Sequence, residues 1–152
     1  MHRFKAAAAA PILLLLLGSA DAPIEAGLWE IRNTPGVATL DGQVLNELPI
    51  GPIEAERICV SAEQAVKPSA FFSRDMDPAC VLKKASTAGG RVDIGGTCPN
   101  QLEGPEGSFE LKGSYDSNSY DIHFATVAFG DNGRMGFTGR LTGKRVGACP
   151  PS

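Results

Sequence analysis

The chain has 152 residues, of which 43% are hydrophobic and 20% are charged, and its net charge is −3. This length fits one globular domain, so a second domain is not expected. A slightly acidic chain without a block of lysine and arginine lacks the electrostatic footprint of a protein that binds nucleic acid or anionic lipid, and neither partner is expected.

The first 20 residues have the layout of a secretory signal peptide. Two basic residues, Arg3 and Lys5, precede an apolar run over residues 6–17, and small residues follow at 18–20. The apolar run has 12 residues, whereas a membrane-spanning helix needs roughly 18–20. The sequence therefore predicts export with removal of this segment, and no membrane span in the mature chain.

Cleavage is expected after Ala20, because a cut after Ala22 would place the ring of Pro23 beside the scissile bond. The mature chain would then be a single all-β domain over residues 21–152. It would keep 12 basic and 17 acidic residues, which give a net charge of −5.

Apolar and polar residues alternate along the mature chain, and turn residues interrupt the alternation about every ten residues, as is typical of an all-β domain. The first strand is expected over residues 27–32, with Trp29 on its apolar face, and Pro35-Gly36 should end it. Asp41-Gly42 then predicts a tight hairpin whose second strand covers residues 43–48.

A further strand is predicted over residues 53–60, and the one helical signal of the domain follows it. Ser61 and Gln64 have the spacing of a capping box, which predicts one short helix near residues 62–67. Residues 67–78 show no clear period, so we expect a loop that folds over the core.

The mature chain contains four cysteines: Cys59, Cys80, Cys98 and Cys149. An even number in an exported protein predicts two disulfides, and the wide spacing differs from the C-x₂₋₄-C pairs of zinc sites, so no metal is expected. Cys80 and Cys98 are equidistant from Gly89, so residues 80–87 and 91–98 would form a hairpin that brings these two cysteines together. Cys59 then pairs with Cys149 by exclusion.

Two turns set the register of three strands in the last third of the chain. A turn at Ser117-Asn118 would place Leu111 opposite Phe124, and a turn at Asn132-Gly133 would place Phe124 opposite Leu141. Both turns predict the same apolar face, which consists of Phe109, Leu111, Ile122, Phe124, Met135, Phe137 and Leu141. The polar face consists of Glu110, Lys112, Asp121, His123, Thr138, Arg140, Thr142 and Lys144. The glycines on the apolar face, Gly113, Gly139 and Gly143, indicate either strand curvature or space for a ligand.

Five features along the chain together carry a family resemblance. They are Gly27-Leu28-Trp29-Glu30 at the start, Cys59-Val60-Ser61 before the helix, the Cys80 to Cys98 hairpin, Tyr115-Asp116 at a turn, and the closing segment Gly143 to Cys149. In this order they resemble the bacterial exported family catalogued as domain of unknown function 3617, over residues 27 to 149. The resemblance implies a Gram-negative envelope location, here the periplasm, and it implies no activity.

Gly27 and Trp29 also match the G-x-W at the first strand of lipocalin-like barrels, with Arg140 or Arg145 available to lie over the indole. The alternative is that Trp29 is an ordinary core aromatic. The expected architecture is a single antiparallel sheet curled into a small barrel or half-barrel, lipocalin-like at most.

No catalytic constellation is found in the sequence. His123 is the only histidine left after removal of the leader, and it lies on the predicted polar face. No G-x-S-x-G occurs, and oxidised cysteines leave no thiolate nucleophile. The acid pair Glu54 and Glu56 is explained by solvated edge charges. We therefore expect a protein that is not an enzyme and has no cofactor.

Three function classes remain open. A binding module for an apolar small molecule is favoured, with Trp29, Leu111, Phe124 and Phe137 as the lining. The second is an envelope structural or protein-interaction domain with a packed interior, and the third is an acid-based hydrolase. A cavity above roughly 300 Å³ would favour binding, a packed interior would favour interaction, and clustered inward acids would favour the hydrolase.

Overall fold

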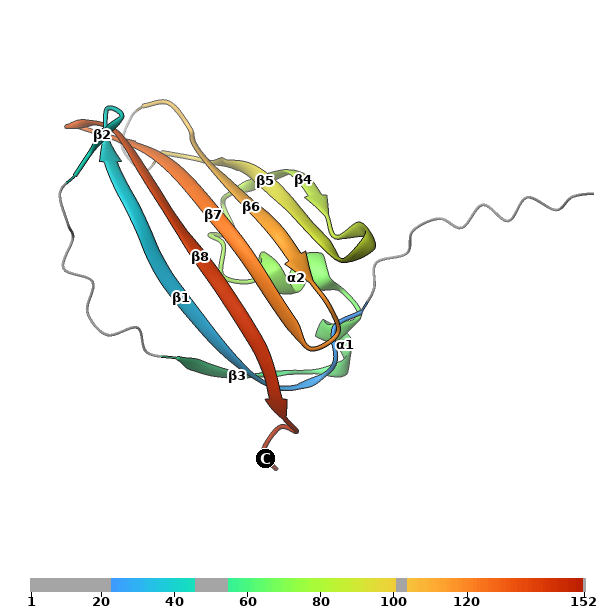
Figure 1. Ribbon diagram of the computed structural model, residues 1–152. Coiled ribbons are helices and arrows are strands. Elements are labelled where there is room, and N and C mark those ends of the chain that lie inside the picture. The colour runs from blue at the N-terminus through green and yellow to red at the C-terminus, as the bar shows by residue number, and fades with distance from the viewer. Residues whose placement is uncertain (1–22, 46–54, 101–103, 152) are drawn as a thin grey trace, which may run out of the picture.

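The computed structural model describes residues 23–45, 55–100 and 104–151. These residues form one antiparallel sheet of eight strands in the order β2-β1-β8-β7-β6-β5-β4, and β3 pairs with the start of β1, at the opposite end of that strand from β2 (Figure 1). The strands are β1 (Gly27–Leu40), β2 (Gln43–Val44), β3 (Glu56–Val60), β4 (Val81–Ser86), β5 (Arg91–Cys98), β6 (Gly107–Tyr115), β7 (Ser119–Gly130) and β8 (Gly133–Gly147). The helices are α1 (Ala62–Ala65), α2 (Pro68–Phe72) and the 3₁₀ turn η1 (Ala88–Gly90).

The sheet is open. Strand β4 lies at one edge and β2 and β3 lie at the other, and within the described residues no ladder joins the two edges. The prediction of an all-β fold with a single antiparallel sheet is therefore confirmed, whereas a closed barrel is not formed. Figure 1 shows α1 and α2 against one face of the sheet, which we call the inner face.

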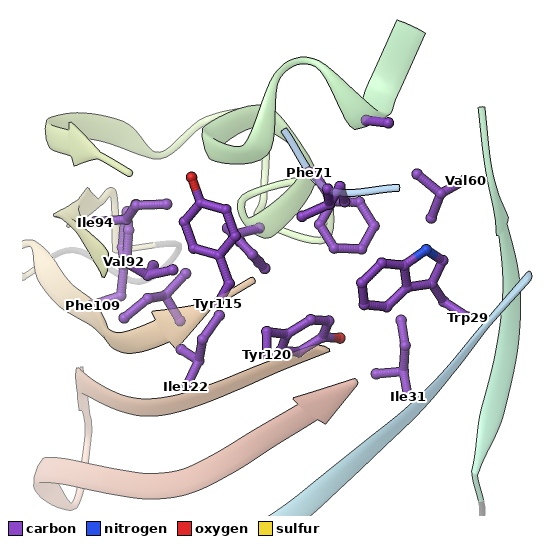
Figure 2. Packing of buried hydrophobic residues seen from close by; sticks show 14 residues of the cluster. Trp29, Ile31, Val60, Phe71, Val92, Ile94, Phe109, Tyr115, Tyr120 and Ile122 are labelled. Atoms are coloured by element: carbon purple, nitrogen blue, oxygen red, sulfur yellow. The ribbon is translucent and has the colours of Figure 1, made fainter. Parts of the chain in front are cut away.

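The core lies between these helices and the inner face. Trp29 of β1 is 0% exposed, and its ring stacks on Tyr120 of β7 with 5.9 Å between ring centroids. Phe71 of α2 packs on both rings at 6.1 Å, and Phe72 packs against Tyr115 and Tyr120 at 5.3 Å (Figure 2). Each such aromatic pair contributes about 0.5–1.5 kcal/mol beyond the area that it buries.

The segment between β3 and β4 contains one helix that the sequence predicts and one that it does not. Ser61 caps α1 as expected, because its hydroxyl accepts from the Gln64 N–H while the Gln64 side chain accepts from the Ser61 N–H. The expectation that residues 67–78 form only a loop is wrong, since α2 begins at Pro68, a residue favoured in the first turn of a helix. A helix of five residues is too short to show a helical period. The expectation that this segment covers the core is confirmed by the buried rings of Phe71 and Phe72.

Both predicted disulfides are present. Cys80 pairs with Cys98 across the open end of the β4–β5 hairpin, with 4.1 Å between their Cα atoms, and Cys59 pairs with Cys149 at 5.5 Å. The hairpin turns at Gly89, which has a φ of 63° that favours glycine. The register has one irregularity, between Leu82 and Lys84.

Strand β1 does not end at Pro35-Gly36, so that prediction is wrong. The strand continues to Leu40 through a register irregularity between Pro35 and Ala38, where Thr138 Oγ1 accepts from the Val37 N–H at 3.0 Å. The hydroxyl replaces a ladder bond, so the strand pairs with β8 on both sides of the irregularity. The tight turn at Asp41-Gly42 is confirmed, with Leu40 opposite Gln43.

The two strands that follow this turn in the chain, β2 and β3, are shorter than expected. Strand β2 contains only Gln43–Val44, and β3 begins at Glu56. The remainder of the predicted 43–48 strand from residue 46, and the predicted strand residues 53 and 54, lie outside the described residues.

One of the two C-terminal registers is correct. The Ser117-Asn118 turn places Leu111 opposite Phe124, as predicted. The second prediction is wrong by two residues: Phe124 lies opposite Gly139 rather than Leu141, and the turn residues are Asp131 and Asn132. Because side chains alternate with a period of two, a shift of two residues keeps every side chain on its predicted face.

Candidate functional site

The inner face carries the side chains that the sequence predicts for it, but it is only partly covered. Phe109, Leu111 and Ile122 are buried. Phe124, Phe137 and Leu141 are partly buried, and Met135 is 51% exposed. The outer face carries the polar set, including an exposed His123.

Among the described residues, the less buried part of this face forms a strip along β7 and β8, which we call the apolar strip and define as Leu141, Phe124, Phe137 and Met135. Phe124 and Phe137 contact each other with 5.7 Å between ring centroids. The rings of α2 reach Tyr115 and Tyr120, nearer the other end of these strands. From Leu141 to Met135 the strand advances by about 20 Å, at roughly 3.4 Å per residue. The strip is therefore long and narrow.

The three inner-face glycines have two structural roles. A Cβ at Gly143 would overlap the ring of Tyr120, and a Cβ at Gly139 would overlap the ring of Phe124. The absence of a side chain at these two glycines therefore lets an aromatic ring pack directly on the backbone of β8. A Cβ at Gly113 would overlap the β7 backbone at Asp121 and Ile122, so this glycine permits a close approach of two strands. The space left by the missing side chains at Gly139 and Gly143 is thus occupied by aromatic rings of the protein itself.

A cavity of about 180 Å³ opens on the inner face at the Leu141 end of the strip. Its lining combines apolar and polar side chains and consists of Ile31, Asn33, Glu56, Phe72, Arg74, Asp75, Tyr120, Ile122 and Leu141. Burial raises the pKa of Tyr120 to about 12, so its hydroxyl keeps its proton at neutral pH. The cavity accepts a small group rather than a whole drug-sized ligand.

Two acids and one arginine surround the mouth of this cavity. The Arg74 guanidinium bonds Asp75 at 3.1 Å, donates to the Phe71 carbonyl at 3.2 Å, and lies 4.5 Å from the centroid of the Phe71 ring. Glu56 lies opposite Ile31 in the ladder, so it shares the inner face with that buried residue. Glu56 is exposed and belongs to the edge strand β3, as the reading of a solvated edge charge predicts. Its position on the inner face follows from the pairing of β3 with β1, which cannot be deduced from residue spacing.

A wider hollow of about 430 Å³ lies on the outer face, among His123, Lys112 and Arg140. Its charges are already paired: Lys112 Nζ lies 2.9 Å from Glu110, and Arg140 Nε donates to Asp121 at 2.7 Å. The hydrogen bond from Arg140 lowers the pKa of Asp121, and the bond to Asp121 raises the pKa of Arg140. Its lining also includes Pro35, Phe124 and Ala125, so the hollow combines paired charges with apolar side chains.

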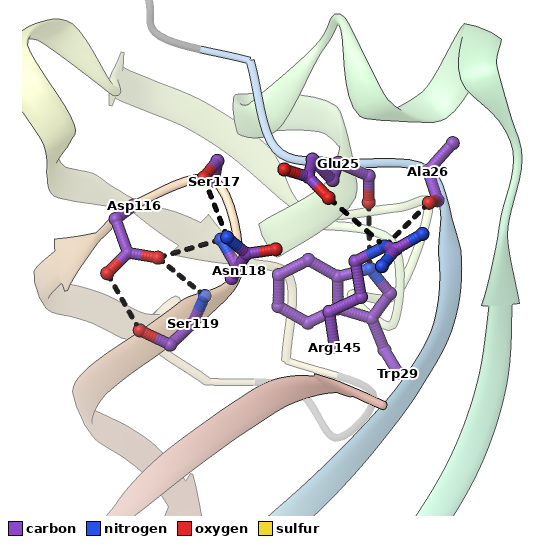
Figure 3. Close-up of polar contacts among 8 residues, drawn as sticks. All are labelled: Glu25, Ala26, Trp29, Asp116, Ser117, Asn118, Ser119 and Arg145. Atoms are coloured by element: carbon purple, nitrogen blue, oxygen red, sulfur yellow. Dashed lines mark hydrogen bonds and ion pairs between the residues drawn. The ribbon is translucent and has the colours of Figure 1, made fainter. Parts of the chain in front are cut away.

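Trp29 and Arg145 form a group of hydrogen bonds with the chain just before β1. Its Nε1 donates to the Glu25 carbonyl at 2.9 Å, and Arg145 Nε donates to the Ala26 carbonyl at 2.9 Å (Figure 3). Arg145 also lies 3.5 Å from the Glu25 carboxylate and is the ladder partner of Trp29. Of the two arginines considered from the sequence, Arg145 is therefore the one beside the indole, and Arg140 lies on the outer face.

The four residues proposed from the sequence as an apolar lining thus fall into two groups. Trp29 and Leu111 are buried in the packed core, whereas Phe124 and Phe137 lie at its open edge. Within the described ranges, no group of three or more histidine, cysteine, aspartate or glutamate residues could hold a metal ion. No helix in the same ranges is long and apolar enough to cross a membrane.

Comparison with known proteins assigns the chain to a family. It belongs to the family described as Protein of unknown function (DUF3617), whose model matches residues 24–149. No curated protein matches the chain, and no solved structure matches it. The family covers the whole described sheet and carries no activity with it.

Proposed function

We propose that this protein is an exported, non-catalytic binding module that holds an elongated apolar small molecule along the apolar strip. The observation that carries the proposal is the inner face of β7 and β8, where Phe124, Phe137 and Met135 continue the core beyond the reach of the helices. A contiguous row of large, partly exposed apolar side chains is typical of a binding surface, whereas single exposed apolar residues occur on most proteins.

The expected affinity is modest. Complete burial of a methylene group contributes about 0.8 kcal/mol. An alkyl chain on an open strip would bury roughly half of its surface, so a 12-carbon chain would gain about 5 kcal/mol, which corresponds to a dissociation constant of roughly 0.2 mM. A protein that samples ligands in the envelope or passes them on can work in this range.

The two disulfides indicate an oxidising compartment. We propose that this compartment is the periplasm and that the leader is removed after Ala20. Intact-mass measurement of protein recovered from the envelope fraction should then give a chain that begins at Asp21. Full-length protein retained in the cytoplasm would contradict both statements.

The neutral fluorescent probe 1-N-phenylnaphthylamine tests the binding site. We expect saturable binding to the wild-type protein and at least about fivefold weaker binding to Met135→Ser, because this change removes an exposed part of the strip. Val81→Ser is the matched control, since Val81 is also an exposed apolar strand residue but lies on β4, outside the strip. Equal loss in both variants, or no saturable binding, would refute the proposal.

A second candidate function is supported by the packed interior. The cavity on the inner face has about 180 Å³, below the roughly 300 Å³ of an ordinary ligand pocket. The same strip could therefore contact an envelope protein. Native mass spectrometry of protein purified from its own envelope distinguishes the two, because a bound small molecule and a bound polypeptide differ in added mass.

A further inference from the structure

The cavity at the Leu141 end of the apolar strip has a chemistry that selects one kind of polar group. Its floor continues the strip through Ile122 and Leu141, so an apolar chain on the strip would place one of its ends at the mouth. The mouth is formed by Glu56, Arg74 and Asp75.

Arg74 is held by groups of the protein itself. Its guanidinium forms an ion pair with Asp75, donates to the Phe71 carbonyl and stacks over the Phe71 ring. The charge of Asp75 is thereby balanced. A ligand anion would have to compete with a neighbouring carboxylate for the same guanidinium.

Glu56 is placed differently. Within the described residues it makes no ion pair, and its neighbour Arg57 pairs instead with Glu30 on the outer face at 3.3 Å. The three charged groups at the mouth therefore sum to one negative charge, which is carried by Glu56 on the inner face. This charge favours a cationic group at the mouth.

Two aromatic rings of the lining complete the site. Phe72 and Tyr120 meet edge to face with 5.3 Å between ring centroids, and both line the cavity. Aromatic rings together with a carboxylate are the groups that bind ammonium ions in proteins, through the negative potential of the ring faces. A volume of about 180 Å³ admits a small ammonium head.

We propose that the ligand is a cationic amphiphile, whose apolar chain lies on the apolar strip and whose ammonium head enters this cavity beside Glu56. The inference rests on the proposed function, since it names the polar end of the same ligand. Glu56 acts as the binding group for the head, and the rings of Phe72 and Tyr120 form its walls.

Two probes with the same chain and opposite heads test the inference: dodecyltrimethylammonium and dodecanoate, both below their micelle concentrations. Trp29 is the only tryptophan of the chain and stacks on Tyr120, so its fluorescence reports on the cavity. We expect the ammonium probe to bind at least about fivefold more tightly than dodecanoate, and Glu56→Gln to remove most of this preference. Glu63→Gln makes the same change in net charge on α1, outside the cavity lining, and should leave the preference unchanged.

The outcomes separate the two proposals. Equal binding of both probes, tighter binding of dodecanoate, or a preference that survives Glu56→Gln would overturn the assignment of the head group and leave the apolar strip as the binding site. Failure of both probes to bind would overturn the strip and the head group together. Loss of the preference in Glu63→Gln as well would show a general effect of net charge, which also overturns the role of Glu56.

Discussion

Three consecutive residues of β7 allow the two faces of the sheet to be compared in one strand. Ile122 is 1% exposed on the inner face, His123 is exposed on the outer face, and Phe124 is partly buried on the inner face. We expect Ile122→Ala to lower the free energy of unfolding by about 3–4 kcal/mol, because a fully buried isoleucine loses its packing and leaves a cavity. His123→Ala should stay within about 0.5 kcal/mol, as surface changes usually do.

Phe124→Ala should fall between these values, at about 2 kcal/mol. Truncation of a fully buried phenylalanine to alanine lowers stability by about 3–5 kcal/mol. The Phe124 ring is only partly buried, over Gly139 and beside Phe137, so its loss should be smaller. Urea denaturation under oxidising conditions gives the three midpoints. A severe loss for His123→Ala with little loss for Ile122→Ala would mean that the strand is displaced by one residue, which would invert the faces and remove the apolar strip.

Three further predictions concern other parts of the fold. Gly143→Ala should cost about 1–3 kcal/mol, because its Cβ would displace the Tyr120 ring, whereas Gly130→Ala meets nothing within 4 Å and should stay within about 0.5 kcal/mol in the same urea assay. Replacing both Cys59 and Cys149 with alanine should cost about 4–5 kcal/mol, since this disulfide joins residues 90 positions apart; an unchanged midpoint would show that the bond does not restrain the unfolded chain. Hydrogen bonds from the backbone of Asn118 and from the side chain and backbone of Ser119 lower the pKa of Asp116. Stability from Asp116 is therefore complete above its ordinary pKa of 3.8 and is lost as the pH falls through the lower, folded-state value. Asp116→Asn should flatten the acid side of the stability profile below about pH 4, and an unchanged acid limb would contradict this.

Local and periodic features of the fold could be predicted from the sequence. The cap at Ser61 depends on residues three positions apart, and the Cys80–Cys98 pair depends on symmetry about one turn. The face of each C-terminal strand depends only on odd or even position, so it is correct even where the register is wrong. These predictions need no knowledge of distant contacts.

The register error has a non-local cause. Asn132-Gly133 is a strong turn sequence, but the structure places Gly133 after the turn, with a φ of 120°, while the Asp41 carboxylate accepts from the Arg134 N–H at 2.8 Å. A contact between two turns that are distant in the chain therefore accompanies the observed register. The sequence near the β7–β8 turn contains no sign of this partner.

The candidate site likewise depends on contacts between distant parts of the chain, which the sequence does not reveal. The alternation of residues predicts which side of β7 and β8 is apolar, but it does not predict how far a covering layer extends. That extent depends on two helices of four and five residues, and the rings of α2 contact Trp29, Tyr115 and Tyr120. The position of Glu56 depends on the pairing of β3 with β1, which joins segments separated by residues 46–54. Both features that define the site are thus products of tertiary packing.

The start of the described chain bears on the proposed removal of the leader. Ile24 is 3% exposed, and its N–H donates to the Ala65 carbonyl at 3.2 Å, so the folded domain includes this residue. Pro23 itself is exposed, so an amine at this position would still contact solvent, and burial of Ile24 does not oppose a cut after Ala22. A cut after Ala20 leaves three residues, Asp21 to Pro23, before the first buried side chain of the described residues, Ile24. The preference for a cut after Ala20 therefore rests on the proline ring that would lie beside the bond cut after Ala22.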